Sequence, residues 1–284
     1  MLAHAILIGL ATLAPATTAP GDTTFTVPAG AKVEIVSPSG DIEVRAGGGR
    51  EARVLADGES DRVRVRRSGN VVRIEPLFFR YEDDADLVIR LPADVSIDIQ
   101  GGSGDITLAG FRTAITIQAL DGDIEVDGGG AVSIHSVDGD VRVVDATGPV
   151  AIEMGDGDAT LVGVGGPIIV HGIDGNITVL RGDASEVALA TVSGDLRYDG
   201  RVYADGDYEL ATHDGDVTFA IGEGIGARVS VLTYDGALIP SFPLQLQGSV
   251  GSIAEFTLGS GSARVQLESF DGDIHLIRPG ERSP

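Results

Sequence analysis

The sequence predicts an all-β protein, a single-stranded parallel β-solenoid (β-helix) whose coils of about 18–21 residues stack on one another. The first observation behind this prediction is a twelve-residue phrase, V-S-I-H-S-V-D-G-D-V-R-V at Val132 to Val143, which recurs in recognisable form at nine other places. The second is that residues of one kind recur at equal distances from the glycine of each phrase. Stacking favours such equal spacing, because the side chains of adjacent coils then form continuous columns.

Each phrase predicts two short strands joined by a turn. Counted from its glycine as position zero, the phrase has apolar residues at minus seven and minus five, and again at plus two and plus four except at Leu238 and Pro240. This alternation is typical of strands with one buried face, and the glycine with its flanking aspartates supplies the turn. The ten reference glycines are Gly40, Gly104, Gly122, Gly139, Gly157, Gly175, Gly194, Gly215, Gly236 and Gly272.

A long antiparallel β-meander with two-residue Asp-Gly hairpins is the alternative fold, since it gives the same local pattern. Position minus three is small or hydroxylic in nine of the ten phrases, with Met154 the exception. Stacking gives that column a physical reason, whereas a meander of about twenty strands would be an unusually wide open sheet. We therefore favour the solenoid.

The first residues are typical of an export signal. An apolar run from Leu2 to Leu13 precedes Ala14-Pro15-Ala16, which fits the small-x-small rule for cleavage after Ala16. The run is too short to span a bilayer, and no later stretch reaches the ~20 apolar residues that a membrane-spanning helix needs. We expect residues 1–16 to be a signal peptide, and the mature chain to be periplasmic, displayed on the cell surface or secreted, and not membrane-spanning.

The regularity of the phrase divides the rest of the chain. Residues 17–96 are expected to form less regular strands that cap the first end and include the phrase at Gly40. Regular solenoid coils are expected over 97–239, an excursion over 240–260, and the last repeat with a C-terminal tail over 261–284. One coil cannot bury enough apolar surface alone, so both ends of the array need caps.

An arginine-rich hairpin lies within the N-terminal region. Its strands are expected at Arg62 to Arg67 and Val71 to Glu75, on either side of a Ser-Gly-Asn turn. We interpret it as a solvated edge whose arginines pair with Glu59, Asp61 and Glu75 and discourage pairing with other sheet edges. The alternative is a docking site for an anionic glycan or lipid headgroup.

Charge limits the classes of partner. The net charge is −23, and residues 91–284 hold 30 acids against 9 bases, so the acidic excess lies almost entirely on the repeats. Nucleic acids and anionic membranes need Lys and Arg to neutralise phosphate, so neither is an expected partner. The composition suits cations or basic partners.

Two columns of aspartate would run along the turns of a stacked array. At plus one lie Asp105, Asp123, Asp140, Asp158, Asp195 and Asp216, and at minus one lie Asp121, Asp138, Asp156, Asp174, Asp214, Asp235 and Asp271. We interpret these carboxylates as caps of turn amides. The alternative is calcium, which takes six to eight oxygen ligands, at Asp121, Asp123, Asp138, Asp140, Asp156 and Asp158. The nonapeptide motif of calcium β-rolls is missing from the sequence.

A third column, at minus four on the outer face, holds His135, Glu153 and His171 in successive phrases. Two imidazoles around a carboxylate are ligands that suit a transition metal. An exposed, merely hydrogen-bonded column is the simpler interpretation of the same residues.

Catalysis is not expected. β-Helical polysaccharide lyases and hydrolases need acids clustered with a basic residue, or a carboxylate pair at a defined separation, in a cleft. Here the acids lie in turns and Arg142, Arg181 and Arg197 are scattered. The chain also lacks a nucleophile motif, a phosphate loop and H-E-x-x-H.

The order of these motifs resembles a known family. L-P-A-D-V-S-I-D-I at Leu91 to Ile99, G-S-G-D-I at Gly102 to Ile106, the serial D-G-D phrases and S-F-D-G-D-I-H-L at Ser269 to Leu276 are similar to the bacterial putative-adhesin family of β-strand-repeat domains of unknown function. The resemblance covers about Phe25 to Ile277. It implies an extracytoplasmic β-helical body without assigned catalysis, and it supplies no functional residues.

We therefore expect an exported, acidic, non-enzymatic β-solenoid that serves as a binding or structural module of the bacterial cell envelope. Its partner is expected to be an envelope protein or glycan, and no cofactor is required. The alternatives are a calcium-dependent module that uses the aspartate columns and a carbohydrate-active β-helix enzyme. The sequence makes no prediction of oligomeric state.

Overall fold

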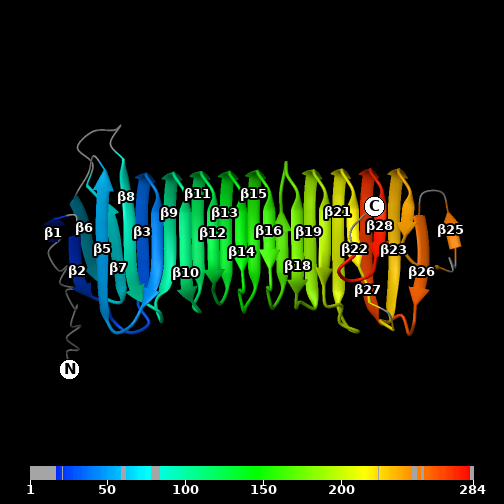
Figure 1. Cartoon of the computed structure of the whole chain (residues 1–284), viewed down its shortest axis with the longest axis horizontal. Helices are drawn as coiled ribbons and strands as arrows, with labels where there is room; N and C mark the ends of the chain where they lie inside the picture. Colours follow the sequence, from blue (N-terminus) through cyan, green and yellow to red (C-terminus); the bar gives the residue numbers. More distant parts are fainter. Residues whose placement is uncertain are drawn as a thin grey trace, which may run out of the picture.

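The computed structural model describes residues 17–20, 22–58, 62–77, 84–222, 224–244, 248–250 and 253–281. Every regular element in these residues is a β-strand. The strands form two sheets that both extend along the long axis of the molecule (Figure 1). No helix in the described part of the chain is long and apolar enough to cross a membrane. The expected signal peptide, residues 1–16, lies outside the described residues.

One sheet has 15 strands and the other has 13. The 15-stranded sheet contains β1 (Thr17–Pro20), β3 (Lys32–Ser39), β6 (Arg62–Ser68), β7 (Val71–Pro76), β9 (Ser96–Ser103), β11 (Ile115–Asp121), β13 (Val132–Asp138), β15 (Val150–Asp156), β17 (Ile168–His171), β19 (Glu186–Ser193), β21 (Asp207–Asp214), β23 (Ala227–Asp235), β25 (Gly248–Val250), β26 (Ile253–Leu258) and β27 (Ala263–Asp271). The 13-stranded sheet contains β2 (Asp22–Thr26), β4 (Ile42–Gly47), β5 (Glu51–Gly58), β8 (Ala85–Pro92), β10 (Ile106–Phe111), β12 (Ile124–Gly128), β14 (Val141–Val144), β16 (Ala159–Val162), β18 (Ile177–Gly182), β20 (Leu196–Gly200), β22 (Val217–Ala220), β24 (Leu238–Pro240) and β28 (Ile274–Ile277).

Each coil gives one strand to each sheet, and from β9 to β22 each coil pairs in parallel with the one before. The register follows the phrase: Ile117 pairs with Ile134, Ile134 with Ile152, and Ile152 with Val170. These pairings confirm the predicted solenoid and rule out the antiparallel meander for this region.

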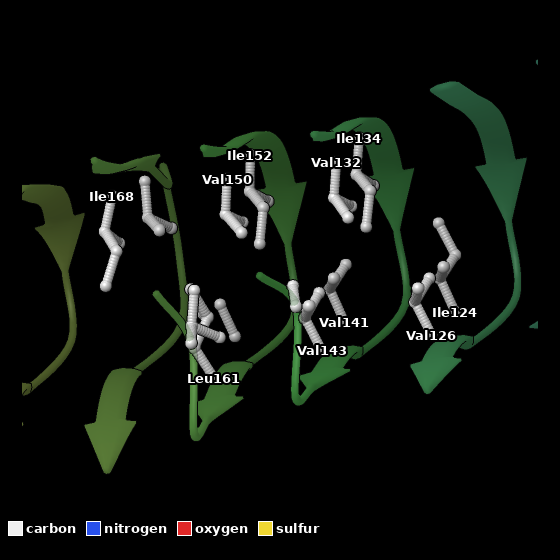
Figure 2. Close-up of a cluster of buried hydrophobic side chains, with 14 of the residues drawn as sticks. Ile124, Val126, Val132, Ile134, Val141, Val143, Val150, Ile152, Leu161 and Ile168 are labelled. Atoms are coloured by element: carbon white, nitrogen blue, oxygen red, sulfur yellow. The ribbon is translucent and has the colours of Figure 1, made fainter. Parts of the chain in front are cut away.

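The core lies between the two sheets and consists of the predicted apolar columns. Ile134 and Ile152 of the 15-stranded sheet and Val143 and Leu161 of the 13-stranded sheet are at most 2% exposed and face the interior (Figure 2). Removing such a buried branched side chain costs about 2–5 kcal/mol, because the neighbouring coils close the gap only in part.

The glycine of the phrase is required by two features of the turn. Gly139 has a φ of 114°, a conformation that L side chains rarely adopt. A Cβ at this position would lie 2.3 Å from the carbonyl oxygen of Gly122 in the preceding coil. A phrase can therefore stack on the preceding one at strand spacing only if its position zero carries no side chain.

Larger side chains fill the core where the coils lengthen. Tyr198, Tyr208 and Phe219 are fully buried, with ring centroids 5.4–5.7 Å apart. The Tyr208 hydroxyl donates to the Ala184 carbonyl at 3.0 Å and accepts from the Tyr203 amide at 2.8 Å. The longer corner that contains Tyr203 thus supplies a partner that a buried phenol needs.

At the N-terminal end, spatial order departs from chain order. The coil β3–β4 lies between β9–β10 and a later coil, β7–β8, with which it pairs in parallel. The β7–β8 coil lacks the glycine phrase, and Ala85 occupies the position of the glycine beside Gly40. The strands β5, β6, β1 and β2 pair antiparallel beyond it. The predicted hairpin is confirmed as β6 and β7.

At the C-terminal end, the last coil is inserted inside the array. β27 pairs in parallel with both β21 and β23, and β28 pairs with both β22 and β24. β26 and β25, from the region expected as an excursion, extend the sheet antiparallel beyond β23. We expected each phrase to stack on the one before. That expectation holds at the N-terminal end, where the phrase at Gly104 stacks on the phrase at Gly40, and it is wrong at the C-terminal end, where the phrase at Gly236 does not stack on the phrase at Gly215. Every phrase presents the same backbone edge, so a long connection can carry the chain past a neighbour.

Candidate binding surface

The plus-one aspartates form a hydrogen-bonded column along the turns. The backbone N–H of Asp140 donates to Oδ1 of Asp123 at 2.9 Å, and the N–H of Asp158 donates to Oδ1 of Asp140 at 2.8 Å. The same bond of 2.8–2.9 Å joins each successive coil in the order Asp86, Asp41, Asp105, Asp123, Asp140, Asp158, Asn176, Asp195, Asp216, Asp273 and Ala237. We call this column the aspartate ladder. From Asp86 to Asp273, one side-chain oxygen of each residue accepts the backbone N–H of the next turn.

The six aspartates considered for calcium lie on one edge of three successive coils. Asp121, Asp138 and Asp156 of the minus-one column are in register and exposed. Their plus-one neighbours each have one oxygen bonded to a backbone N–H. Within the described residues, no group of three or more His, Asp or Glu side chains is placed to hold a metal ion. The calcium hypothesis stays a prediction that needs a binding measurement.

The structure also brings His135, Glu153 and His171 into one column, on three adjacent strands of the 15-stranded sheet. His135 Nδ1 lies 3.4 Å from Glu153 Oε2, and both side chains are exposed. The transition-metal hypothesis for these residues likewise stays a prediction.

The minus-two position carries a surface feature that sequence reasoning missed. Six of the nine large hydrophobic side chains that are exposed in the described part of the chain lie in this one column. They are Leu120 (63%), Val137 (50%), Ile173 (62%), Val192 (52%), Phe270 (48%) and Tyr234 (72%). The registers at the flanking positions place successive members on adjacent coils, with Gly155 as an interruption. We call the column, together with His213, the apolar ridge.

The ridge ends in a stack of three rings. His213 and Phe270 lie 4.7 Å apart between ring centroids, and Phe270 and Tyr234 lie 5.0 Å apart with an interplanar angle of 8°. The rings come from β21, β27 and β23, which are neighbours only because the last coil is inserted. The signal available in the sequence was the recurrence of an apolar or aromatic residue at minus two, an outward position.

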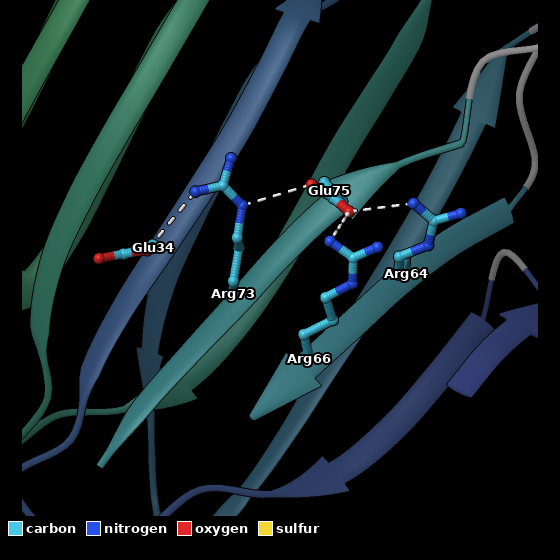
Figure 3. Close-up of polar contacts among 5 residues, drawn as sticks. All are labelled: Glu34, Arg64, Arg66, Arg73 and Glu75. Carbon is cyan, nitrogen blue, oxygen red and sulfur yellow. Dashed lines mark hydrogen bonds and ion pairs between the residues drawn. The ribbon is translucent and has the colours of Figure 1, made fainter. Parts of the chain in front are cut away.

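The arginine-rich hairpin is internally paired, as interpreted from the sequence. Glu75 lies 3.3 Å from Arg64, 3.4 Å from Arg66 and 3.3 Å from Arg73, and Arg73 also reaches Glu34 at 3.6 Å (Figure 3). The other two expected partners, Glu59 and Asp61, lie outside the described residues. Arg64, Arg66 and Arg73 are thus engaged in ion pairs within the N-terminal end, and the docking alternative stays a prediction.

An apolar cavity of about 350 Å³ opens at the other end of the array. Ile221, Ile225, Phe242 and Leu258 contribute its apolar wall, and Arg278 lies at its margin. It lies beside the connections that lead into and out of the terminal strands, away from the aspartate ladder.

Comparison with known proteins agrees with the family resemblance. The model of the family described as toastrack DUF4097 matches residues 57–277. No protein with a curated description matches the chain.

Three solved structures of bacterial proteins are similar at low identity. A putative adhesin from Bacteroides fragilis is 14% identical, with a TM-score of 0.34, and the match covers 93% of this chain and 97% of the other. A putative lipid binding protein from Parabacteroides distasonis is 11% identical, with a TM-score of 0.34 and coverage of 91% and 97%. A putative cell adhesion protein from Clostridium sporogenes is 11% identical, with a TM-score of 0.23 and coverage of 92% and 100%. None of these likenesses assigns a ligand to this chain.

Proposed function

The chain belongs to the toastrack DUF4097 family, and we propose that it is an exported, non-enzymatic binding module of the bacterial cell envelope. Its recognition surface is the apolar ridge with the aspartates beside it, and its partner is an extended, basic segment of another envelope protein. The observation that carries this proposal is the concentration of exposed hydrophobic side chains in one column.

Scattered exposed hydrophobic residues need no explanation, but contiguous ones mark interaction surfaces. The ridge spans eight coils from Leu120 to Tyr234, about 34 Å at a strand spacing of ~4.8 Å. Burying apolar surface contributes about 25 cal/mol per Å². A partner that covered the ridge would therefore gain affinity from side chains that the fold itself leaves in water.

Charge selects the class of partner. Asp138 and Asp140 follow Val137 at the turn, and at least one aspartate follows each aliphatic or aromatic member of the ridge in the same way. An apolar centre with a charged rim is the usual anatomy of a protein interface. The rim here is acidic, so it attracts and orients a basic segment and repels nucleic acid and anionic lipid.

The hydrogen bonds of the plus-one aspartates support a non-enzymatic role. The plus-one carboxylates accept hydrogen bonds from the backbone of the neighbouring turn. Glycoside hydrolysis instead needs two carboxylates facing each other across a bound sugar.

The test is the affinity of a twelve-residue peptide that alternates arginine and valine, measured by fluorescence anisotropy. Combining Leu120→Ser, Val137→Ser and Ile173→Ser should weaken binding at least about tenfold, because three apolar contacts are lost. Higher ionic strength should weaken binding to the wild type through screening of the acidic rim.

A matched control is Leu55→Ser, Val88→Ser and Ile169→Ser, which changes exposed apolar residues that lie off the ridge. This control should bind the peptide as the wild type does. Equal affinity of the ridge variant and the control would contradict the proposal. Binding of a neutral glucan oligomer with no binding of the peptide would contradict the choice of a protein partner.

A further inference from the structure

The ring stack at the end of the apolar ridge has one uncovered face. Tyr234 stacks on Phe270 on one side, yet 72% of its surface is exposed. The next strand, β26, pairs with β23 only from Ala227 to Leu232, so the described pairing stops short of Tyr234. The stack therefore ends in an aromatic face that is open to a ligand.

Carboxylates occupy the ends of the three strands that carry the rings. Asp214, Asp271 and Asp235 each follow one ring of the stack, and they are in register on adjacent strands. All three are exposed. A ligand on the Tyr234 ring would thus have Asp235 and Asp271 within the same corner of the array.

A flat aromatic face next to carboxylates suits a guanidinium group. Arginine stacks on aromatic rings and pairs with carboxylates through its planar fork of N–H donors. The chain already contains this arrangement elsewhere: Cζ of Arg201 lies 4.5 Å from the ring centroid of Tyr203, and Arg201 lies 3.8 Å from Asp183.

We propose that the stack of His213, Phe270 and Tyr234, with Asp235 and Asp271, is a binding site for an arginine side chain of the partner. This inference rests on the proposed function, because it names the anchor of the same surface. The arginine stacks on the open face of Tyr234, and its guanidinium donates to the two carboxylates. The rest of the partner segment then lies along the aliphatic side chains of the ridge.

The experiment compares three peptides of one sequence that carry arginine, lysine or citrulline between the valines. Citrulline has nearly the shape of arginine without its charge. The wild type should bind the arginine peptide most tightly. Tyr234→Leu with Phe270→Leu should weaken binding of that peptide about fivefold, because the apolar area is largely kept and the π faces are lost. The same variant should leave the affinity for the citrulline peptide nearly unchanged.

Two further variants separate recognition from loss of structure. Tyr234→Phe keeps the ring and should keep the preference for arginine. Asp235→Asn with Asp271→Asn should reduce that preference about as much as loss of the rings does. Melting temperatures within about two degrees of the wild type would show that each variant is folded.

The possible failures are distinguishable. If the ring variant binds all three peptides as the wild type does while the ridge variant loses binding, the arginine site is overturned and the proposed function stands. If the wild type binds none of them, both are overturned. If a neutral glucan tetramer binds at Tyr234 and the peptides show no preference for arginine, the ring stack is a saccharide platform and the inference is wrong.

Discussion

The backbone N–H of Asp140 donates a 2.9 Å hydrogen bond to the side chain of Asp123, which lies one coil earlier. This bond joins two turns rather than closing one, and it explains why aspartate follows the glycine of the phrase. Neighbouring carboxylates at ~4.8 Å repel by about 0.9 kcal/mol at the dielectric constant of water. A satisfied backbone amide contributes about the same amount, so the column is tolerated.

Asn176 indicates what this position requires. It occupies the column and accepts the N–H of Asp195 through its side-chain oxygen at 2.8 Å. Asp140→Asn should therefore change the free energy of unfolding by less than about 0.5 kcal/mol. Asp140→Ala should lower it by about 1–2 kcal/mol, because the N–H of Asp158 loses its acceptor. Chemical denaturation checks both values, and equal losses for Asn and Ala would show that the hydrogen bond is not what matters.

Gly139→Ala should destabilise the array by about 3 kcal/mol or more. Its backbone has a positive φ, and the added Cβ would meet the Gly122 carbonyl. Gly48→Ala is the matched control, since a Cβ there has no heavy atom within 4 Å. Thermal melts of the two variants should differ by several degrees. A shift for Gly139→Ala as small as that of the control would contradict the close stacking of turns.

Ile134→Asp should unfold several coils. The side chain is 2% exposed and lies between Ile117 and Ile152 in the core column. An unpaired carboxylate at this place should lower the free energy of unfolding by about 4 kcal/mol or more. Ser133→Asp, one residue away on the exposed side, should have little effect. A melting temperature of Ile134→Asp within a degree or two of the wild type would contradict the placement of Ile134 in a buried core column.

The core and the turns could be predicted because both depend on local pattern. The pairing of Ile117 with Ile134 and of Ile134 with Ile152 follows from their equal distance to a glycine. The positive φ at Gly139 follows from the turn that two short strands need.

The order of the coils at the ends could not be predicted. Strand pairing depends on backbone edges, which are alike in all phrases, so nothing in β27 distinguishes the edge of β21 from that of β23. The β7–β8 coil escaped notice because Ala85 stands where the phrase has glycine.

The candidate surface was half predicted. The aspartates were singled out, and their role as caps was the favoured interpretation. The apolar ridge was not predicted, because the residue at minus two varies in type among the phrases, from Pro38 and Gly155 to Val137 and Tyr234. The ring stack was beyond reach, since Phe270 lies between His213 and Tyr234 only after the last coil is inserted.

The effect of calcium on the melting temperature distinguishes a module that binds calcium from one that does not. If the aspartates serve as turn caps, millimolar calcium and magnesium at equal ionic strength should raise the melting temperature slightly and equally, by screening. A calcium site would add about 2.7 kcal/mol at a hundredfold excess over Kd, and magnesium would lag because it demands tight octahedral geometry. We expect equal, small shifts. A calcium-specific rise that Asp140→Asn with Asp158→Asn abolishes would establish the site.

The most direct test of the account is methyl NMR of the full chain during titration with the arginine-valine peptide. The account predicts that the largest shift changes fall on the methyl groups of Leu120, Val137, Ile173 and Val192. The methyl groups of Leu55, Val88 and Ile169, exposed to a similar or lesser degree off the ridge, should change little. Largest changes at these three residues, or none at the ridge when the peptide is saturating, would contradict the claim that the ridge is the recognition surface.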